Sequence, residues 1–232
     1  MILIPLQTFG IGDVIFTQTL VRSLAKEGDK ILWPVESHFV EGLNRAYPDI
    51  TFIDKRFVDV DYNDPTDRMI GECRILPIRF ADQILNVPYS QCMSSKYVLY
   101  NMDWIDWKEK AQWILDLDNI EELYGELDLQ PNEEYILVNK YFGSDSQLVA
   151  PIKIDSPIRQ IEMRTIPGFS LFDWAAIICG ASIIHTVSTS IFYILEVLSL
   201  KAKEIHLYVR KPIETDFRNI DYLFTKNYIL HE

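Results

Sequence analysis

Short apolar runs alternate with segments of helical periodicity in the opening part of the chain. Residues Ile2–Leu6 form an apolar run, and from Val14 apolar positions recur at helical spacing until the pattern ends before Gly28. A second strand, a second helix with Ser37 as its N-cap and a third strand are predicted at Lys30–Pro34, Ser37–Ala46 and Ile50–Ile53. Because helices join these strands, we expect the strands to be parallel, with right-handed crossovers. This pattern is typical of the first half of a doubly wound sheet.

The middle of the chain has a weaker pattern. Asp59–Asp67 is acidic and rich in turn residues, and Arg74–Leu85 has room for a strand followed by a short helix. The tryptophan-containing segment from Trp104 follows helical spacing as far as Leu123. Polar and turn residues then interrupt the apolar pattern over Gly125–Pro131, which predicts a linker.

A second series of strands and helices begins after this linker. The predicted extended segments are Tyr135–Val138, Ile158–Ile166, Ser182–Val187 and Glu204–Val209. The predicted helices are Ser170–Cys179, with Ser170 as N-cap and Asp173 at position N3, and Ser190–Leu200. The sequence therefore predicts an α/β fold with two Rossmann-like domains, residues 1–126 and 132–232.

Composition and charge narrow the class of protein. The chain has 232 residues, of which 48% are hydrophobic and 24% charged, as in folded globular proteins. Its net charge of −12 argues against a nucleic-acid partner, because a phosphate backbone would repel it. No apolar stretch approaches the roughly 20 residues that span a bilayer, and the first residues lack the features of a signal peptide. We therefore expect a cytoplasmic location.

The cysteines do not suggest a disulfide framework or a zinc site. Cys73, Cys92 and Cys179 are too few and too scattered for either. Cys179 lies in an apolar run, where a buried and unreactive thiol is expected.

Two turns that follow predicted strands have residues suited to ligand chemistry. In the first, Gly10–Asp13, the glycines let the backbone approach a ligand, and the helix that follows offers its N-terminal N–H groups to an anion. The third glycine of a dinucleotide-binding motif is absent, as is a Walker motif, so the turn does not favour NAD chemistry or ATP hydrolysis. Asp13 either caps the helix or acts as a general base in a cleft, and the two roles are compatible.

The second turn is Val187–Ile191. It presents the hydroxyls of Ser188, Thr189 and Ser190 together with backbone N–H groups, a combination that suits a diphosphate. An ordinary Ser/Thr helix cap is the alternative interpretation.

Both turns belong to segments that resemble one family. Residues 10–24 resemble the opening of heptosyltransferase-type glycosyltransferases, in which a first strand leads into a Gly-Asp turn and a helix. Residues 167–190 resemble the second signature of that family, in which a Ser-Leu helix is followed by a Gly-Ala turn, a strand and a phosphate loop. The resemblance implies a GT-B arrangement of two Rossmann-like domains that face each other across a cleft. The first domain would hold the acceptor and the second the nucleotide-sugar donor, with no metal or other cofactor.

The resemblance also implies roles for individual residues. Asp13 corresponds to the family's catalytic aspartate, the base that deprotonates the acceptor hydroxyl. Gly12, the residue before it, would contact the sugar donor. Phe169 falls on the residue that lies against the nucleotide base. Three positions depart from the family: Ser188 replaces an aspartate, Ser190 replaces a glycine, and Tyr193 replaces a histidine that donates to phosphate. A tyrosine hydroxyl can also donate a hydrogen bond.

Other side chains are weaker candidates. A diphosphate held without a metal needs a cation, for which Lys140 is the first candidate and Lys153 and Arg164 are alternatives, unless these are solvated surface charges. Trp104 could stack on an acceptor sugar, although tryptophans at helical spacing also form cores. Glu196 is expected to reach a ribose or to be a surface charge on a helix.

Together these features favour a metal-independent inverting glycosyltransferase with Asp13 as general base, acting on a nucleotide-diphosphate sugar and a glycan acceptor. The alternatives are a nucleotide-sugar epimerase and a non-catalytic homologue that binds a nucleotide or sugar. The sequence leaves open whether the chain forms a homo-oligomer.

Overall fold

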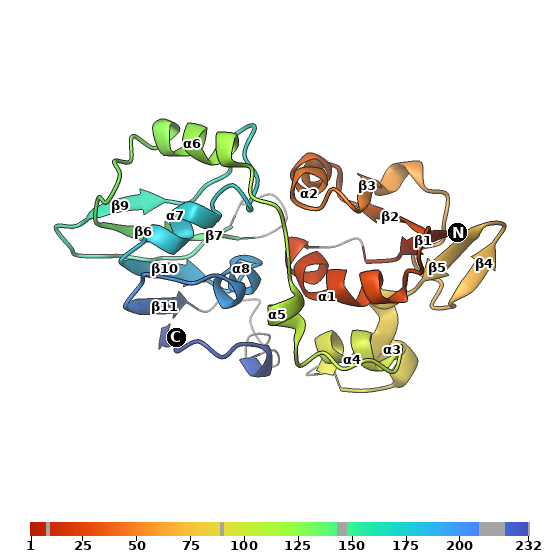
Figure 1. Ribbon diagram of the computed structural model, residues 1–232. Helices are drawn as coiled ribbons and strands as arrows, with labels where there is room; N and C mark the ends of the chain where they lie inside the picture. The colour runs from red at the N-terminus through yellow and green to blue at the C-terminus, as the bar shows by residue number, and fades with distance from the viewer. Residues whose placement is uncertain (8–9, 89–90, 143–147, 209–220, 232) are drawn as a thin grey trace. The chain divides into compact units, whose positions relative to one another are not determined.

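The chain folds into two compact units in a computed structural model, which describes residues 1–7, 10–88, 91–142, 148–208 and 221–231. The units are Met1–Ile114 and Leu115–Glu232, and each is built around its own five-stranded sheet (Figure 1). The described part of the chain has no helix that is both long enough and apolar enough to cross a membrane.

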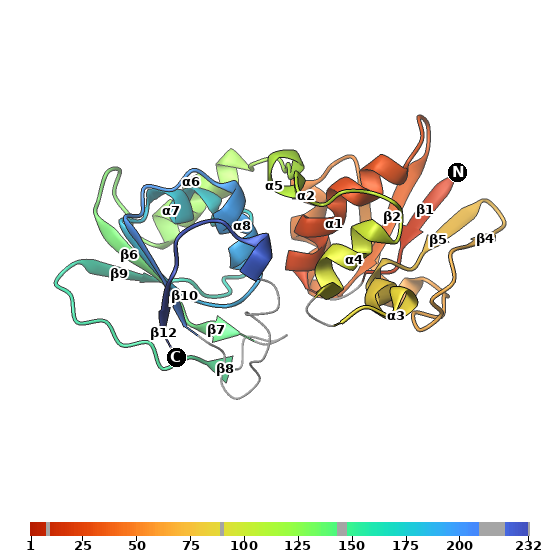
Figure 2. The same cartoon turned by 90° about the horizontal axis from the view of Figure 1, so that it is seen from below.

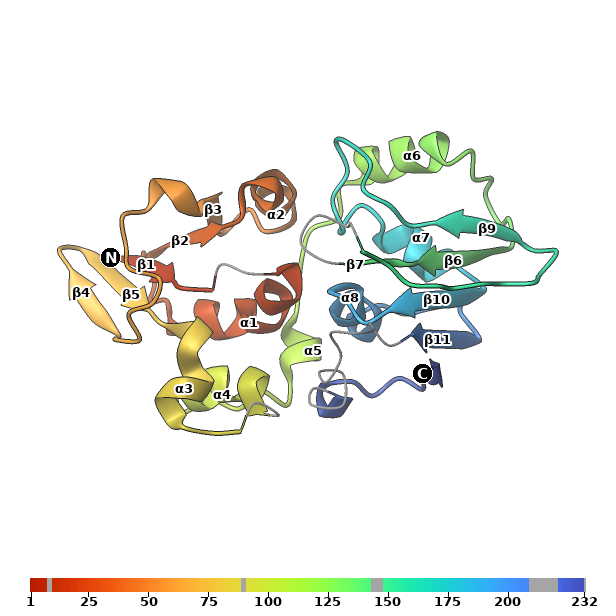
Figure 3. The same cartoon turned by 180° about the vertical axis from the view of Figure 1, so that it is seen from behind.

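The sheet of the first unit has the strand order β3-β2-β1-β5-β4 (Figure 3). Its strands are β1 (Ile2–Pro5), β2 (Lys30–Val35), β3 (Thr51–Asp54), β4 (Arg68–Ile70) and β5 (Cys73–Leu76). The pairs β1–β2, β2–β3 and β1–β5 are parallel, whereas β4 pairs antiparallel with β5. The predicted parallel arrangement of the first three strands is therefore confirmed. The antiparallel strand at the edge was not predicted.

The first unit has five α-helices in the described residues. They are α1 (Ile11–Leu24), α2 (Val40–Ala46), α3 (Ala81–Leu85), α4 (Cys92–Val98) and α5 (Trp107–Lys110). The short helix expected within Arg74–Leu85 is present as α3, and α4 was not predicted. Ser37 does not cap α2, because residues Ser37–Phe39 form a separate 3-10 turn before it. The predicted continuous helix from Trp104 to Leu123 is also wrong, because non-helical backbone separates α5 from the next helix.

Helices α1, α4 and α5 pack together on one face of the sheet of the first unit. The ring of Phe16 on α1 lies 5.1 Å from that of Tyr97 on α4 and 5.4 Å from that of Trp107 on α5. On the opposite face, Ile4, Leu6 and Ile75 are covered by an irregular segment that contributes the three partly buried side chains Val58, Val60 and Tyr62. An extended segment thus takes the place of a second helical layer.

The second unit has an all-parallel sheet in the order β12-β11-β10-β6-β9. Its strands are β6 (Tyr135–Asn139), β9 (Arg159–Glu162), β10 (Ile183–Val187), β11 (Glu204–Tyr208) and β12 (Ile229–His231). A separate two-stranded hairpin pairs β7 (Tyr141–Phe142) with β8 (Leu148–Val149). The helices are α6 (Leu117–Glu126), α7 (Ala175–Gly180) and α8 (Ile191–Val197).

This unit repeats the one-sided layering of the first. Figure 2 shows α6, α7 and α8 on one face of the sheet and β7 and β8 on the other. Phe142, Ala150 and Val187 form the core beneath the hairpin. The expectation that the first strands and helices belong to a doubly wound sheet, with helices on both faces, is not met by the described residues of the first unit. The prediction of α/β units with mainly parallel strands is right.

The boundary between the units lies earlier than the sequence suggested. We expected residues 1–126 to form the first domain, but α6 belongs to the second unit. It is held there by Asn119, whose side chain donates to the carbonyl of Gly168 at 3.4 Å, and by Tyr124, whose hydroxyl donates to the carbonyl of Ala176 at 3.5 Å. The arrangement of two domains across a cleft stays a prediction.

Helix α7 begins later than predicted, although the polar residues ahead of it interact as expected. Asp173 accepts hydrogen bonds from the backbone N–H and the hydroxyl of Ser170, at 2.6 and 2.8 Å. The backbone between them forms turns, and the regular helix starts only at Ala175.

Candidate active site

Asp13 lies in the first turn of α1, directly after the carboxyl end of β1. Ligands of parallel α/β sheets bind at this edge, where strands end and helices begin. The N-cap of α1 is Gly10, and Asp13 is the acidic residue of the first turn, where a carboxylate interacts favourably with the helix dipole. The backbone of Asp13 is fixed on both sides: its N–H donates to the carbonyl of Gly10 at 3.2 Å, and its carbonyl accepts from the hydroxyl of Thr17 at 2.7 Å.

The carboxylate of Asp13 forms an ion pair with Lys96 on α4. The lysine side chain is 7% exposed and the aspartate side chain is 25% exposed, so the ammonium group is buried and the carboxylate reaches the surface. The Lys96 ammonium also contacts the sulfur of Met93 at 3.3 Å. Sequence analysis missed Lys96, because a lysine on a short polar helix gives no sign that it is buried.

Two further groups lie near this ion pair or at the same strand end. Burial, together with the charges of Asp82 and Asp13, raises the pKa of the Cys92 thiol on α4. The charge of Lys96 opposes them, but the pKa stays above its usual value. Gln7 follows β1 and is 2% exposed, and no described residue gives its buried amide oxygen a hydrogen bond. The first unit thus holds an oriented carboxylate, a buried cation and a buried amide near one edge of its sheet.

In the second unit, Asn139 connects two strand ends. It is the last residue of β6, is 7% exposed, and donates from its amide nitrogen to the hydroxyl oxygens of Thr186 at 2.9 Å and Thr189 at 3.2 Å. Because the Thr189 oxygen accepts this bond, its own proton points elsewhere and can be donated to a ligand. Asn139 was not predicted as a site residue. A polar residue closing an otherwise apolar strand was the signal available in the sequence.

The predicted phosphate loop occupies the turn between β10 and α8. Ser188 is 6% exposed, whereas Thr189 and Ser190 are partly exposed. The first backbone bonds of the turn run from Phe192 N–H to the Thr189 carbonyl at 3.1 Å and from Tyr193 N–H to the Ser190 carbonyl at 3.2 Å. Because the loop directly follows the last residue of β10, it lies at the carboxyl end of the sheet.

Phe169 and Tyr193, which were also predicted to bind the sugar donor, lie in different surroundings. Phe169 is half-buried in the turn after Gly168, which has a φ of +88°. This turn leads into α7, which runs back to the start of β10, so Phe169 lies on the carboxyl-end side of the sheet. Tyr193 is only 6% exposed, and its ring packs edge-on against Phe224 at 5.5 Å.

Lys140 lies at the same sheet edge but is paired with a carboxylate. Its ammonium forms an ion pair with Glu162 at the end of β9, and the hydroxyl of Tyr141 donates to the same carboxylate at 2.5 Å. The hydrogen bond to Glu162 raises the pKa of Lys140. Burial raises the pKa of Glu162, but the hydrogen bonds from Lys140 and Tyr141 and the nearby charge of Arg164 outweigh it and leave that pKa lowered. Arg164, one of the two alternative cations, is thus within electrostatic reach of Glu162.

The remaining predicted site residues differ in how far they are exposed. Lys153 is exposed, Gly12 is buried in α1, and Trp104 is half-buried next to the fully buried Trp107. Glu196 is neither a surface charge nor a ribose ligand, because it is 7% exposed and its carboxylate accepts four hydrogen bonds from residues 225–228. Within the described ranges, no group of three or more His, Cys, Asp or Glu side chains could hold a metal ion.

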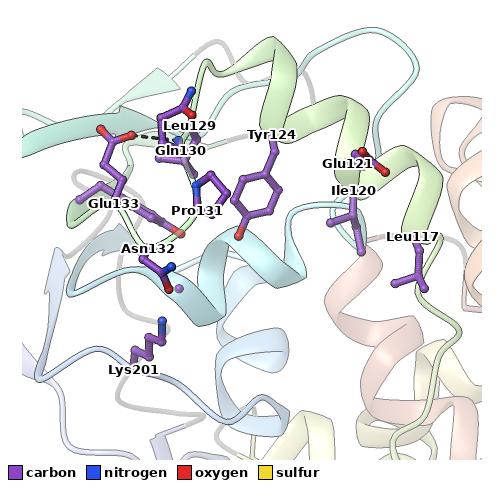
Figure 4. A pocket seen from close by; sticks show the side chains of 12 residues that line it. Leu117, Ile120, Glu121, Tyr124, Leu129, Gln130, Pro131, Asn132, Glu133 and Lys201 are labelled. Atoms are coloured by element: carbon purple, nitrogen blue, oxygen red, sulfur yellow. Dashed lines mark hydrogen bonds between the residues drawn. The ribbon is translucent and has the colours of Figure 1, made fainter.

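Two cavities lie away from these residues. A cavity of about 490 Å³ in the second unit is lined by α6 residues such as Tyr124, by Pro131 and Asn132, and by Lys201 (Figure 4). It also touches Tyr135, the first residue of β6, which places it at the amino ends of the strands, opposite the hydroxyl turn. A cavity of about 660 Å³ in the first unit lies between the last turns of α1 and residues 109–114.

The chain was compared with known proteins. No family model and no curated protein matches it. Among solved structures it is similar to a glycosyl transferase of family 9 from Veillonella parvula DSM 2008, with 12% identity, a TM-score of 0.45, and 99% of this chain and 86% of the other covered. It is also similar to the heptosyltransferase WaaC of E. coli with ADP-2-deoxy-2-fluoro heptose, with 13% identity, a TM-score of 0.44, and 100% and 93% covered.

Proposed function

We propose that this chain is a metal-independent inverting glycosyltransferase, which moves a sugar from a nucleotide-diphosphate sugar to a hydroxyl of a glycan acceptor. The observation that carries the proposal is the placement of the two motifs. Asp13 follows the carboxyl end of β1, and the hydroxyl turn Ser188–Ser190 follows the carboxyl end of β10. Each motif therefore occupies the ligand-binding edge of its own parallel sheet.

In the first unit, Asp13 acts as the general base. Its carboxylate accepts the proton of the acceptor hydroxyl while the oxygen forms a bond to the anomeric carbon of the donor sugar. The bond from that carbon to the diphosphate breaks, and the diphosphate leaves with the electron pair. Asp13 suits this role because its carboxylate is partly exposed and its backbone is fixed in the first turn of α1.

In the second unit, the hydroxyl turn receives the diphosphate. The proton of Thr189 and the hydroxyls of Ser188 and Ser190 are donors for phosphate oxygens, and Asn139 fixes the Thr189 oxygen. Lys140 and Arg164 supply positive charge at the adjacent strand ends, as a departing diphosphate requires when no metal ion takes part. Binding a diphosphate at Lys140 draws its ammonium away from Glu162, because both anions compete for the same cation.

A non-catalytic nucleotide- or sugar-binding protein is the second candidate, and two observations favour it. Lys140 is already neutralised by Glu162, and Tyr193, which replaces a phosphate-binding histidine of the family, is buried. A protein of this kind would bind a nucleoside diphosphate but would neither hydrolyse nor transfer the sugar of a nucleotide-diphosphate sugar.

Calorimetric titration with UDP, GDP, ADP and CDP, followed by transfer assays with the corresponding sugar donors, separates these functions. We expect one nucleoside diphosphate to bind and Thr189→Val to weaken its binding about 10-fold, the equivalent of one lost hydrogen bond to a charged group. The matched control is Ser182→Ala, which removes a hydroxyl that donates to the Tyr135 carbonyl at the opposite end of the sheet. Binding without transfer or donor hydrolysis would favour the non-catalytic protein. No binding of any nucleotide would contradict the glycosyltransferase and would leave, of the second candidate, only a protein that binds a sugar.

A further inference from the structure

The buried position of Lys96 requires an explanation. Lysine is almost never buried without a partner, because removing its charge from water is costly. Lys96 as a whole residue is 5% exposed. Among the described residues, the charged partner of its ammonium group is Asp13, which is distant in the sequence. The charge that offsets the cost of burial is that of Asp13, so the burial points to a role at Asp13.

The geometry of the pair leaves one carboxylate oxygen available. Lys96 donates to Oδ1 of Asp13, and no described residue donates a hydrogen bond to Oδ2. Oδ2 lies on the side of Gly10, where an added Cβ would be only 3.5 Å away. The lack of a side chain at Gly10 therefore keeps the approach to Oδ2 open.

We propose that Lys96 is a positioning residue for glycosyl transfer: its ammonium holds Oδ1 of Asp13 so that Oδ2, beside Gly10, takes the proton of the acceptor hydroxyl. The inference rests on the proposed function, in which Asp13 is the general base. The proton moves from the hydroxyl to Oδ2 as the new glycosidic bond forms and the bond to the diphosphate breaks, and it later leaves to water. Lys96 keeps its own protons throughout.

Other ionisable groups packed around the pair do not replace Lys96. The Cys92 thiol on α4 lies within electrostatic reach of both partners and of Asp82 on α3. Asp82 has the same sign of charge as Asp13 and cannot hold its carboxylate. Burial holds the pKa of Cys92 above its usual range, so the thiol is neutral. Lys96 is thus the cation among these groups.

The first experiment compares Lys96→Met with wild type in a steady-state transfer assay. Methionine keeps the length and apolar stem of the side chain and removes the charge. We expect kcat to fall about 100-fold, as for a reacting group that loses its orientation, with the KM for the donor unchanged. The matched control is Lys110→Met, because Lys110 is an exposed lysine that pairs with Asp106 within one helical turn in the same unit. That control should keep wild-type kinetics.

A double-variant cycle tests whether Lys96 acts through Asp13. In the Asp13→Asn background, Lys96→Met should lower the residual transfer rate less than twofold, because the group it positions is gone. If Asp13→Asn abolishes transfer and Lys96→Met leaves kcat intact, the positioning role is wrong while the proposed function stands. If Asp13→Asn transfers at the wild-type rate, the proposed base itself is wrong.

Chemical rescue separates positioning from a structural role. Lys96→Ala removes the side chain, and ethylammonium ions in the buffer should restore at least 10-fold of the lost kcat by placing an ammonium group next to Oδ1. Ethanol at the same concentration serves as the uncharged control. Circular dichroism of Lys96→Ala verifies the fold. A folded variant that ethylammonium does not rescue would contradict the proposal.

A separate variant, Gly10→Ala, tests whether the acceptor hydroxyl approaches Oδ2 from the side of Gly10. The added methyl group would lie in van der Waals contact with Oδ2, at 3.5 Å. We expect kcat for transfer to fall at least 10-fold while nucleoside diphosphate binding is unchanged. Unchanged transfer by Gly10→Ala would show that the acceptor does not approach from this side.

Discussion

Replacing Glu196 by glutamine should destabilise the second unit, because its carboxylate joins α8 to the C-terminal segment. One oxygen accepts hydrogen bonds from the backbone N–H of Thr225 at 2.9 Å and from its hydroxyl at 3.1 Å. The other accepts from the backbone N–H of Lys226 at 3.1 Å and from the hydroxyl of Tyr228 at 2.8 Å. Burial, followed by the charge of Glu196 and its hydrogen bond, raises the pKa of Tyr228, so this hydroxyl stays a donor.

The size of the effect follows from the number of donors. In either orientation the amide of Glu196→Gln turns its NH2 group toward one backbone N–H and one hydroxyl. The hydroxyl can rotate and accept a hydrogen bond from the amide, so the backbone N–H is the donor that loses its acceptor. A buried donor left without an acceptor costs about 1–3 kcal/mol, which is the loss we expect. For a unit of this size that lowers the Tm by roughly 5–10 °C.

Differential scanning calorimetry measures this change, and hydrogen exchange locates it. The amides of Thr225 and Lys226 should lose protection before those of β6 and β10. The control is Glu122→Gln, which changes an exposed glutamate on α6 of the same unit. A loss below about 1 kcal/mol in Glu196→Gln would refute the reasoning, because buried donors cannot lose their acceptor at so small a cost.

Three further changes test other parts of the structure. Asn139→Ala should weaken nucleoside diphosphate binding about 10-fold in calorimetry, because the oxygen of Thr189 loses the donor that orients it; equal affinity would contradict this. Burial and two neighbouring imidazoles lower the pKa of His185 from 6.5 to about 4. Because the unfolded chain binds this proton more tightly, stability should fall as the pH drops below about 6.5, by at most about 2 kcal/mol between pH 7 and 5; urea unfolding at both pH values should show this loss in wild type and a smaller one in His185→Gln. Gly180→Ala should lower the Tm, because its Cβ would lie 2.7 Å from the hydroxyl of Tyr135; an unchanged Tm would show that the Tyr135 ring can move aside.

Local sequence pattern predicted most of the strands and the position of both turns. Apolar runs such as Ile2–Leu6 and Ser182–Val187 became β1 and β10 within one residue at each end. The position of Asp13 after a strand and in the first turn of a helix could likewise be predicted. These features depend on neighbouring residues, which a single sequence contains.

Contacts between distant residues could not be predicted. The partner of Asp13 is Lys96 on another helix, and the acceptor for Tyr228 is Glu196, which the sequence suggested would face solvent or a ribose. Helical periodicity shows which positions share a face but not which segment covers that face. For the same reason the pattern of the first strands suggested a doubly wound sheet. Instead, an irregular segment covers the second face in the first unit, and the β7–β8 hairpin lies on that face in the second.

The most direct test of the proposed function is the rate of sugar transfer by Asp13→Asn at saturating donor. Asparagine keeps the shape of the side chain and removes its ability to accept a proton. We predict a kcat at least 100-fold below wild type, the usual contribution of a general base, with an unchanged Kd for the nucleoside diphosphate. Transfer by Asp13→Asn at the wild-type rate would contradict the assignment of this carboxylate as the base.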